Sequence, residues 1–292
     1  MIDLHMHSCY SDDGALTPEE LVAMCAARGI DRMALTDHNC VRGVPEALAA
    51  ASENGISCIT GIEIDCVYRD VNFHVLGYGI NIESSDFAKI ENNVEEQGIQ
   101  ASLEMFDKTR RLGFDWLTKA DMQELSKNHL RQDVWTGEMF AEALLAKPEY
   151  AGHPLLEPYR QGGLRSDNPF VNFYWDYYAQ GKPCYVKLKY PFMEQIISMI
   201  QQNHGIAVLA HPGVNIKGKE HLLDGILSLG MDGIEVYSSY HTREQAQYFY
   251  HEAAVRGLKV TCGSDFHGRT KPSIYLGEYG IGAAEAIKKI VL

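Results

Sequence analysis

The sequence opens with Met1-Ile-Asp-Leu-His5-Met-His7-Ser-Cys-Tyr-Ser-Asp12, an apolar start that runs directly into two histidines. In an extended strand, residues i and i+2 point to the same side, so His5 and His7 would present two imidazoles to one point. Such a pair is half of a metal site. The remaining ligands must then come from segments elsewhere in the chain.

The chain of 292 residues is long enough to bury one large core. Its hydrophobic content of 46% is typical of a globular protein and argues against disorder. No apolar run approaches the roughly 20 residues of a bilayer span, and no basic region precedes an apolar one at the start. We therefore expect a cytoplasmic protein with no membrane partner.

The charge and the cysteines exclude two further classes of protein. A formal net charge of −13 repels a nucleic-acid backbone, so a nucleic-acid polymer is not an expected partner. The seven cysteines are scattered and contain no C-x-x-C pair, which argues against a disulfide framework and against a cysteine zinc site. A small anionic substrate held by a metal cluster fits this composition better.

The first 80 residues alternate between strand and helix patterns. Thr17-Pro-Glu-Glu20 is a helix start, because the threonine can cap the helix, proline suits its first position and Glu20 can close a capping box. A second helix is expected at 45–53, and strands are expected at 32–38, 57–63 and 72–78. Short connections between alternating strands and helices predict a parallel sheet or barrel.

This alternation is interrupted between residues 84 and 181, where the sequence predicts only helices, at 86–112, 132–146 and 168–180. It resumes with strands at 183–187, 205–211, 232–237 and 258–267, and with helices at 193–203 and 242–256. We therefore expect a barrel in two parts, residues 1–83 and 182–292, with a helical insertion of residues 84–181 between them.

Polar side chains recur at the ends of the apolar strands. They are His5, His7, Asp37, His38, Glu63, His211, Asp265 and His267. In α/β barrels the carboxyl ends of the strands open on one face, where active sites are built. A single strand-end histidine is more often a hydrogen-bonded structural residue, but five strands that share the feature favour a metal centre, because burying so much polarity without ions is costly.

These residues lie in motifs that resemble the polymerase and histidinol phosphatase (PHP) family of metal-dependent phosphoesterases, in the family's order and over both barrel parts. The motifs are His5-x-His7 with Asp12, Thr36-Asp37-His38, Gly61-Ile-Glu63, Phe73-His74-Val-Leu-Gly77, Ala210-His211-Pro212-Gly213 and Gly263-Ser-Asp265-Phe-His267-Gly268. The resemblance implies a distorted (βα)7 barrel, here with an inserted helical subdomain, that holds two or three divalent ions.

The resemblance also implies the ligand sets. One metal would be held by His5, His7, Glu63 and Asp265, a second by Glu63, His74 and His211, and a third by Asp12, His38 and His267. Six imidazoles with three carboxylates suit Zn²⁺, Mn²⁺ or Fe²⁺ better than Mg²⁺ or Ca²⁺, which prefer oxygen. The implied reaction is attack on phosphorus by a hydroxide that bridges two of the ions.

Other residues are candidates for supporting roles. Asp37 stands beside a ligand and could orient a neighbouring histidine, and His241, just beyond a strand end, could contact the phosphate or the leaving group. Four cations could clamp the substrate: Lys187 and Lys189, which would share one face of a strand, and Arg269 and Lys271, which follow the last ligand. The remaining histidines, at 129, 153, 204, 221 and 251, receive no role.

Substrate specificity is expected to reside in the insertion. Relatives that act on nucleoside 3′,5′-bisphosphates carry an arginine and a histidine where this chain aligns Gly137 and Met139. The absence of these two residues argues against that substrate and leaves room for a sugar phosphate or a cyclic phosphate ester, with a nucleotide phosphate as the third expected class. The aromatic run Phe170, Phe173, Tyr174, Trp175, Tyr177 and Tyr178 is more typical of a subdomain core than of a base-stacking platform.

Two alternatives remain. Amidohydrolases, which cleave C–N bonds, also use His-x-His and a late aspartate in a barrel, but the set Asp12, His38 and His267, the lack of a lysine near Glu63 and the candidate cations disfavour that chemistry. A metal-stabilised binding module without enzymatic activity is disfavoured by the complete set of ligands.

Overall fold

The computed structural model describes residues 1–127 and 131–279. Seven strands follow one another around a nearly closed barrel in the order of the sequence. They are β1 (Ile2–Asp3), β2 (Arg32–Leu35), β3 (Ser57–Tyr68), β4 (Val71–Tyr78), β5 (Ile206–Leu209), β6 (Gly233–Ser238) and β7 (Lys259–Gly263). The first and last strands meet where the amide of Leu4 donates to the carbonyl of Cys262 over 3.1 Å. The distorted barrel expected from the sequence is thereby confirmed.

One strand runs against the others. β3 pairs with β4 and β4 pairs with β5 in antiparallel fashion, whereas the other neighbouring strands are parallel. The two residues between β3 and β4, Arg69 and Asp70, both have positive φ angles of 47° and 60°, as a tight two-residue hairpin turn requires. The alternation of the sequence indicated a parallel sheet, and Arg69-Asp70 is not one of the pairs, such as Asn-Gly or Asp-Gly, that mark such a turn.

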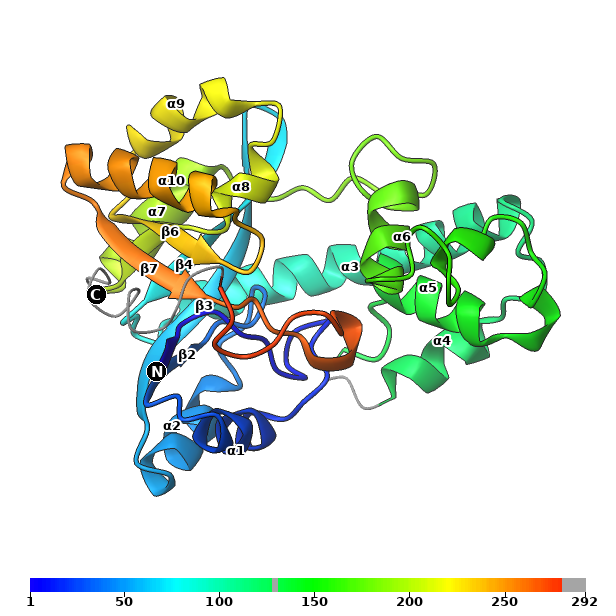
Figure 1. The fold of residues 1–292 in the computed structure, drawn as a ribbon, viewed down its shortest axis with the longest axis horizontal. Coiled ribbons are helices and arrows are strands. Elements are labelled where there is room, and N and C mark those ends of the chain that lie inside the picture. Colours follow the sequence, from blue (N-terminus) through cyan, green and yellow to red (C-terminus); the bar gives the residue numbers. More distant parts are fainter. Residues whose placement is uncertain (128–130, 280–292) are drawn as a thin grey trace.

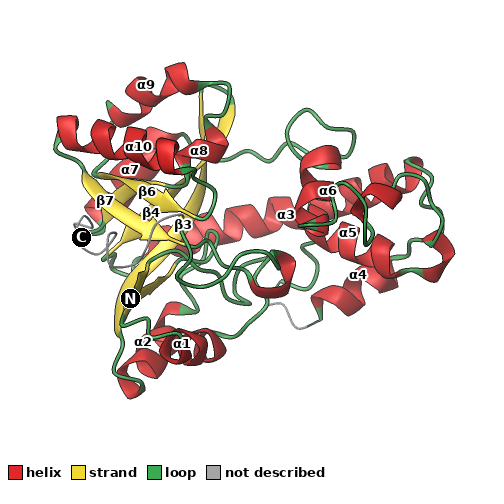
Figure 2. Cartoon of the chain, viewed as in Figure 1, coloured by secondary structure: helices red, strands yellow, loops and turns green. Residues whose placement is uncertain are grey.

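The helices of the described residues surround the barrel or extend from it (Figures 1 and 2). They are α1 (Pro18–Ala27), α2 (Val44–Glu53), α3 (Ser85–Arg111), α4 (Lys119–Ser126), α5 (Gly137–Ala146), α6 (Pro169–Tyr177), α7 (Met193–Gln202), α8 (Pro212–Asn215), α9 (Leu223–Leu227) and α10 (Arg243–Arg256). Short 3-10 turns occur at Pro148–Tyr150, Glu157–Tyr159, Glu220–Leu222 and Gly268–Thr270. The predicted capping box of α1 is present: Thr17 accepts from the amide of Glu20, whose side chain accepts from Thr17 in return.

The helices α3 to α6 form a subdomain beside the barrel, and α3 runs from one to the other (Figure 1). The subdomain has its own core, in which the buried rings of Phe114, Phe140 and Phe173 take part. The strand predicted at 183–187 is absent from the structure. Instead, the amide of Cys184 donates to the carbonyl of Tyr177 and that of Tyr185 donates to Lys182, so this segment turns rather than extends.

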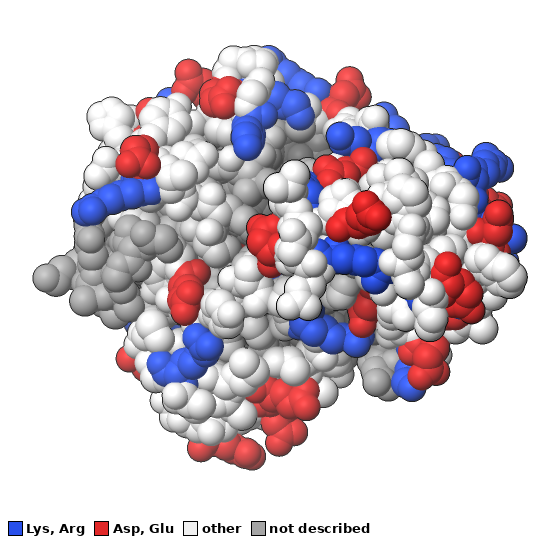
Figure 3. Space-filling view, turned by 45° about the vertical axis from the view of Figure 1, so that its right-hand side comes forward, with Lys and Arg blue, Asp and Glu red and all other residues white. Residues whose placement is uncertain are grey.

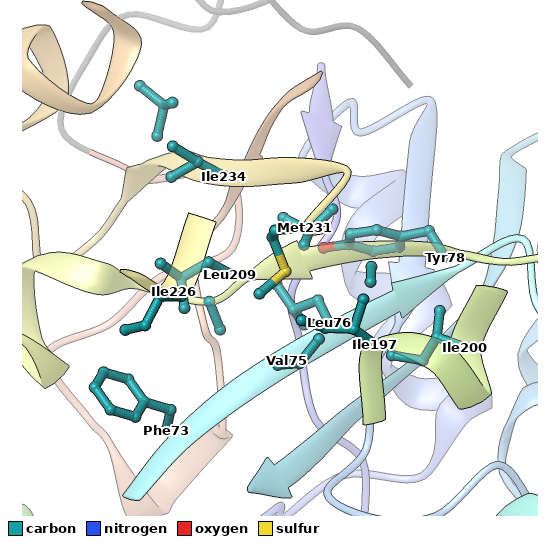
Figure 4. Packing of buried hydrophobic residues seen from close by; sticks show 14 of the residues in the cluster. Phe73, Val75, Leu76, Tyr78, Ile197, Ile200, Leu209, Ile226, Met231 and Ile234 are labelled. Carbon is teal, nitrogen blue, oxygen red and sulfur yellow. The ribbon is translucent and has the colours of Figure 1, made fainter. Parts of the chain in front are cut away.

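The barrel core consists of apolar side chains from the strands and from the helices that pack against them. Figure 4 shows Ile197 and Ile200 of α7 beside Leu76 and Tyr78 of β4. A Cβ atom at Gly77 would meet the Ile200 side chain at 3.2 Å, so the absence of a side chain there lets α7 approach β4 closely. In the described part of the chain, no helix combines the length and the apolar character needed to cross a membrane.

Candidate metal centre

The strand ends bring histidines and carboxylates into one cluster at the carboxyl end of the barrel. The cluster consists of four overlapping groups whose potential ligand atoms lie within 4.8 Å of one another. The groups are His5, His7, Glu63 and Asp265; Glu63, His74 and His211; His7, Asp13, His38 and His267; and His38, Asp65 and His74. Nearly all the residues expected from the sequence therefore converge, and two carboxylates that were not expected join them.

Glu63 lies at the centre of this cluster. Its Oε1 atom lies 2.9 Å from His74 Nδ1 and 3.0 Å from His211 Nε2, while its Oε2 atom lies 3.1 Å from His5 Nε2. Burial by itself would raise the pKa of Glu63, but the surrounding histidines outweigh burial and hold this pKa well below its ordinary value. The carboxylate is therefore ionised and shared by two of the groups.

Asp265 closes the first group from the end of β7. Its Oδ1 atom lies 3.1 Å from His5 Nε2 and 3.0 Å from His7 Nε2. Its other oxygen, Oδ2, accepts hydrogen bonds from the Tyr240 hydroxyl over 2.6 Å and from the Lys271 ammonium group over 2.7 Å. The predicted cation Lys271 thus contacts a candidate metal ligand directly.

The structure differs from the sequence-based expectation at the third group, where the carboxylate is that of Asp13 and not of Asp12. Asp13 Oδ2 lies 3.0 Å from His267 Nε2 and 3.8 Å from His38 Nε2. Asp12 instead accepts two hydrogen bonds, of 3.0 and 3.2 Å, from the guanidinium group of Arg131. Arg131 belongs to the helical subdomain and is buried, and a buried guanidinium group requires an anionic partner. Asp12 of the barrel is that partner.

Four of the six histidines share one orientation, whereas His38 and His74 turn Nδ1 toward Glu63. The Nδ1 atom of His5 lies 2.9 Å from Glu235 Oε1, that of His7 lies 3.1 Å from Ser11 Oγ, that of His211 lies 2.6 Å from Asn215 Oδ1, and that of His267 lies 2.8 Å from the carbonyl of Asp265. In each case Nδ1 is engaged outside the cluster and Nε2 faces into it. For His5, His211 and His267 the partner is an oxygen acceptor, which favours the tautomer with Nε2 unprotonated and free to bind a metal.

Unsatisfied polar atoms test whether the cluster fits metal ions. Five of its buried atoms have no properly directed hydrogen bond: His7 Nε2, Asp13 Oδ1, His38 Nδ1, Asp265 Oδ1 and His267 Nε2. Buried polar atoms without partners are costly and rare, so a concentration of them in one cluster calls for bound cations. A mixed set of imidazole and carboxylate donors suits Zn²⁺, Mn²⁺ and Fe²⁺.

Two ligand positions have a strained backbone. The φ angles of His211 and Asp265 are 24° and 59°, in the region that residues with side chains seldom adopt. Such conformations typically cost about 1–3 kcal/mol each and persist only where surrounding contacts impose them. The amide of His211 donates to Glu235 Oε2 over 2.8 Å, and the amide of Asp265 donates to the carbonyl of His5 over 2.8 Å. These bonds help to hold both ligands in place.

The two residues predicted to act catalytically lie outside the cluster. Asp37 orients no imidazole: its carboxylate accepts hydrogen bonds from the amide and the hydroxyl of Ser8, over 2.6 and 2.7 Å, and thereby fixes the loop that follows His7. His241 is buried, its Nδ1 donates to the carbonyl of Val236, and its Nε2 accepts from the amide of Gly213. Because both ring nitrogens of His241 are occupied by the backbone, neither is free for a phosphate.

Three of the four predicted cations are also placed elsewhere. Lys187 and Lys189 are exposed, and neither ammonium group contacts the cluster in the described structure. They do not share a strand face, because the segment is not a strand; the backbone of Lys189 is instead held by Gln97 of α3. Arg269 donates to Glu142 of α5 over 3.1 Å and so links the barrel to the subdomain. His129 lies outside the described residues.

Sequence reasoning missed three residues that support the cluster. Asp65 lies 3.0 Å from His74 Nε2 and follows Glu63 at i+2 on β3, so strand periodicity alone would have placed both on one side. Glu235 is a lone carboxylate in the apolar strand β6, which is an unusual position without a partner. No sequence signal distinguished Arg131, because a buried role depends on how the subdomain meets the barrel.

A further carboxyl group, that of Glu138, lies buried on the first turn of α5. Burial raises its pKa to about 7, and the nearby Asp13 acts in the same direction, whereas Lys271 and Thr136 oppose the increase. Glu138 thus reaches from the subdomain to the neighbourhood of residues on the barrel that belong to the cluster or contact it. At neutral pH it exchanges between the neutral and the charged form.

Glu138→Gln is expected to stabilise the metal-free protein above pH 7. Because the folded state resists ionisation of Glu138, the penalty is absent below its ordinary pKa of 4.5, grows between pH 4.5 and 7, and is complete above pH 7. It amounts to at most about 3 kcal/mol. Denaturant unfolding of both proteins at pH 4.5 and pH 8 measures it, with the exposed Glu149→Gln as control. An equal effect of Glu138→Gln at both pH values would contradict the expectation.

Comparisons with known proteins agree with the metal centre that the geometry indicates. The model of the PHP domain family matches residues 3–155. The chain is 30% identical over 269 residues to a 3′,5′-nucleoside bisphosphate phosphatase of Chromobacterium violaceum, and the alignment covers 91% of the chain and 87% of the relative. It is 28% identical to a 5′-3′ exoribonuclease of Haemophilus influenzae (91% and 89%) and 26% identical to a phosphoribosyl 1,2-cyclic phosphate 1,2-diphosphodiesterase of Eggerthella lenta (91% and 94%).

Solved structures of similar proteins cover the whole fold. A protein of Bifidobacterium adolescentis, described by assignment as a metal-dependent phosphoesterase, superimposes with a TM-score of 0.77 at 27% identity, over 99% of this chain and 96% of the other. A protein of Chromobacterium violaceum, described as an amidohydrolase with bound sulfate and no metal, superimposes with a TM-score of 0.76 at 28% identity, over 99% and 97%.

Proposed function

The chain belongs to the PHP domain family and is a metal-dependent phosphoesterase, and we propose that it hydrolyses the phosphate ester of a small phosphorylated metabolite with two or three divalent ions. The observation that carries this proposal is the set of overlapping ligand groups centred on Glu63, with their inward-facing and unsatisfied donor atoms. A single isolated metal site would not require a carboxylate shared between neighbouring groups.

We propose the following distribution of ligands. His5, His7, Glu63 and Asp265 would hold one ion, and Glu63, His74 and His211 would hold a second. Asp13, His38 and His267 would hold a third, with Asp13 in place of the expected Asp12. Bound divalent ions would activate water as a nucleophile and offset the negative charge of the phosphoryl group. Mn²⁺, Zn²⁺ and Fe²⁺ are the candidates.

The protein's own residues prepare the site for this chemistry. Glu235 holds His5 by its Nδ1 atom and His211 by its backbone amide, which aims both ligands at Glu63. Tyr240 and Lys271 fix the outer oxygen of Asp265, so that its inner oxygen stays directed at His5 and His7. Lys271 also places a positive charge beside the cluster, where it would favour an anionic substrate.

A panel of esters tests the proposed function. The substrates are sugar phosphates, cyclic phosphates, nucleotides, a single-stranded RNA oligonucleotide and N-acyl amino acids, each assayed after dialysis against a chelator and after addition of Mn²⁺, Zn²⁺ or Fe²⁺. We expect phosphate release from a small ester that disappears with the chelator and returns with metal. Metal-replete protein that hydrolyses none of the phosphate esters would refute the proposal.

Two arms of the panel address the alternatives. The amidohydrolase alternative has the similar structure from Chromobacterium violaceum in its favour, and it predicts cleavage of the N-acyl amino acids. Digestion of RNA from its 5′ end is the activity for which some relatives are named. The face of the molecule in Figure 3 carries interspersed acidic and basic side chains rather than a basic stripe, which supports a small substrate over a polymer.

A further inference from the structure

A cavity of about 420 Å³ lies between the subdomain and the barrel. On the subdomain side its wall is the face of α6 that carries Asn168 and Trp175. On the barrel side its wall is formed by the loop after β6, at Ser239 and Tyr240, and by the chain beyond β7, which includes Tyr275. The volume falls in the range of roughly 300–1,000 Å³ that is usual for small-molecule pockets.

The cavity adjoins the metal centre through Tyr240. The Tyr240 hydroxyl donates to Asp265 over 2.6 Å, and the Tyr240 ring lies perpendicular to the His211 ring with 5.9 Å between their centroids. One side chain therefore forms part of the cavity wall and contacts two candidate metal ligands. A molecule that contacts Tyr240 in the cavity would be separated from Asp265 and His211 by this one side chain.

Exposed aromatic rings line this cavity. Trp175 is 45% exposed, although Phe173 and Tyr178 on either side of it in the sequence are buried in the subdomain core. Tyr174 holds the Trp175 indole in an edge-to-face contact at 5.4 Å. Tyr275 is 46% exposed, with the guanidinium group of Arg28 over its ring at 5.6 Å. The aromatic run thus divides into core residues and a tryptophan that is partly exposed and can stack on a ligand.

The cavity also offers unused hydrogen-bonding atoms. The side-chain oxygens of Asn168 and Ser239 have no hydrogen-bond partner in the described structure, although both are shielded from solvent. Asn168 stands at the N-cap position of α6, yet its side chain makes no capping bond. Buried polar atoms of this kind are normally satisfied, so these two atoms suit the polar edge of a ligand.

The charge of the lining limits what the ligand can be. Among the described residues that form the wall, there is no lysine or arginine, whereas Asp167 and Glu278 contribute carboxylates. Arg28 lies 4.0 Å from Glu278 and offsets part of its charge, but the described wall itself has no cation that would bind a second phosphate group. An uncharged aromatic ring with polar edges meets both the stacking surface and the unsatisfied oxygens.

From these observations we propose that the cavity binds the leaving group of the substrate, and that this leaving group is a nucleoside whose single phosphoryl group lies at the metal centre. The inference rests on the proposed phosphoesterase function and names its substrate class. It makes a nucleoside monophosphate a better substrate than the corresponding nucleoside bisphosphate, in contrast to the relative named for bisphosphates.

Trp175→Ala tests the proposal because it should weaken recognition of the base without affecting recognition of the phosphate. Stacking of a base on an aromatic side chain is worth enough that its removal should raise KM for adenosine monophosphate about 5- to 150-fold. The KM for ribose 5-phosphate, which lacks the base, should not change. Trp116→Ala, at a tryptophan that is 65% exposed and outside the cavity wall, is the matched control, and Trp175→Phe should restore most of the loss.

Calorimetric titration of metal-free protein with adenosine keeps this test independent of catalysis. We expect adenosine to bind the wild type and Trp116→Ala, and to bind Trp175→Ala at least about fivefold more weakly. Absence of adenosine binding by the wild type, or an equal effect of Trp175→Ala on both esters, overturns the inference. Adenosine binding without phosphate release from any ester would instead overturn the proposed function and leave the nucleoside site in place.

Discussion

Glu63→Gln is expected to reduce kcat/KM for phosphate release by at least about 10³-fold, because it neutralises the carboxylate that two ligand groups share. The Glu63 oxygens lie 2.9 to 3.1 Å from imidazole nitrogens, which is hydrogen-bonding distance. Changing a residue that merely supports a metal ligand typically costs 10- to 100-fold in metal affinity or activity. The loss of a shared ligand should exceed that range. Steady-state kinetics with saturating Mn²⁺ and elemental analysis of the purified variant measure the effect.

The control for Glu63→Gln is Glu244→Gln, which makes the same chemical change at an exposed position on α10. Cooperative thermal unfolding of both variants would show that any loss of activity is not a loss of fold. A Glu63→Gln protein that keeps its metal content and more than a tenth of the wild-type kcat/KM would show that Glu63 does not bridge two ions.

Asp13→Asn is expected to reduce kcat/KM by at least about 100-fold, whereas Asp12→Asn should reduce it less than about tenfold. Asp13 is the carboxylate that lies with His38 and His267, and one of its oxygens is buried without a partner. Asp12 is committed to Arg131, so its neutralisation should weaken the contact between barrel and subdomain instead. Parallel kinetics and metal analysis of the two variants measure the difference.

The two adjacent aspartates serve as controls for each other, since both substitutions remove one charge from the same loop. Asp12→Asn should show the greater loss of thermal stability, because it leaves the buried Arg131 with fewer anionic partners. The reverse pattern, with activity abolished by Asp12→Asn and nearly unchanged in Asp13→Asn, would restore the ligand set expected from the sequence and would mean that the loop rearranges when metal binds.

Much of the barrel could be predicted from the sequence because its signals are local. The helix start at Thr17-Pro-Glu-Glu20 depends on residues within one turn, and the strand ends carry histidines and carboxylates that a core would not otherwise tolerate. The antiparallel course of β4 was missed, because the hairpin turn has Arg69-Asp70 where Asn-Gly or Asp-Gly would mark it. Propensity gave no warning of that turn.

The supporting residues of the site could not be predicted for a different reason. The choice between Asp12 and Asp13 depends on Arg131, more than a hundred residues away, and that contact exists only once the subdomain packs against the barrel. The same holds for Lys187 and Lys189, whose predicted strand is replaced by turns in the structure. Charge and position along the chain showed that a cation was available, but not where it would point.

The central claim is that the cluster around Glu63 binds the metal ions on which phosphoester hydrolysis depends. The most direct test is a titration of metal-free protein with Mn²⁺ in which bound metal and the rate of phosphate release, from the best substrate of the ester panel, are measured on the same samples. We expect no release without metal, and a rate that rises with bound Mn²⁺ and levels off at two to three ions per chain. Phosphate release that is unchanged in the metal-free protein, or full binding of metal without any release, would contradict the claim.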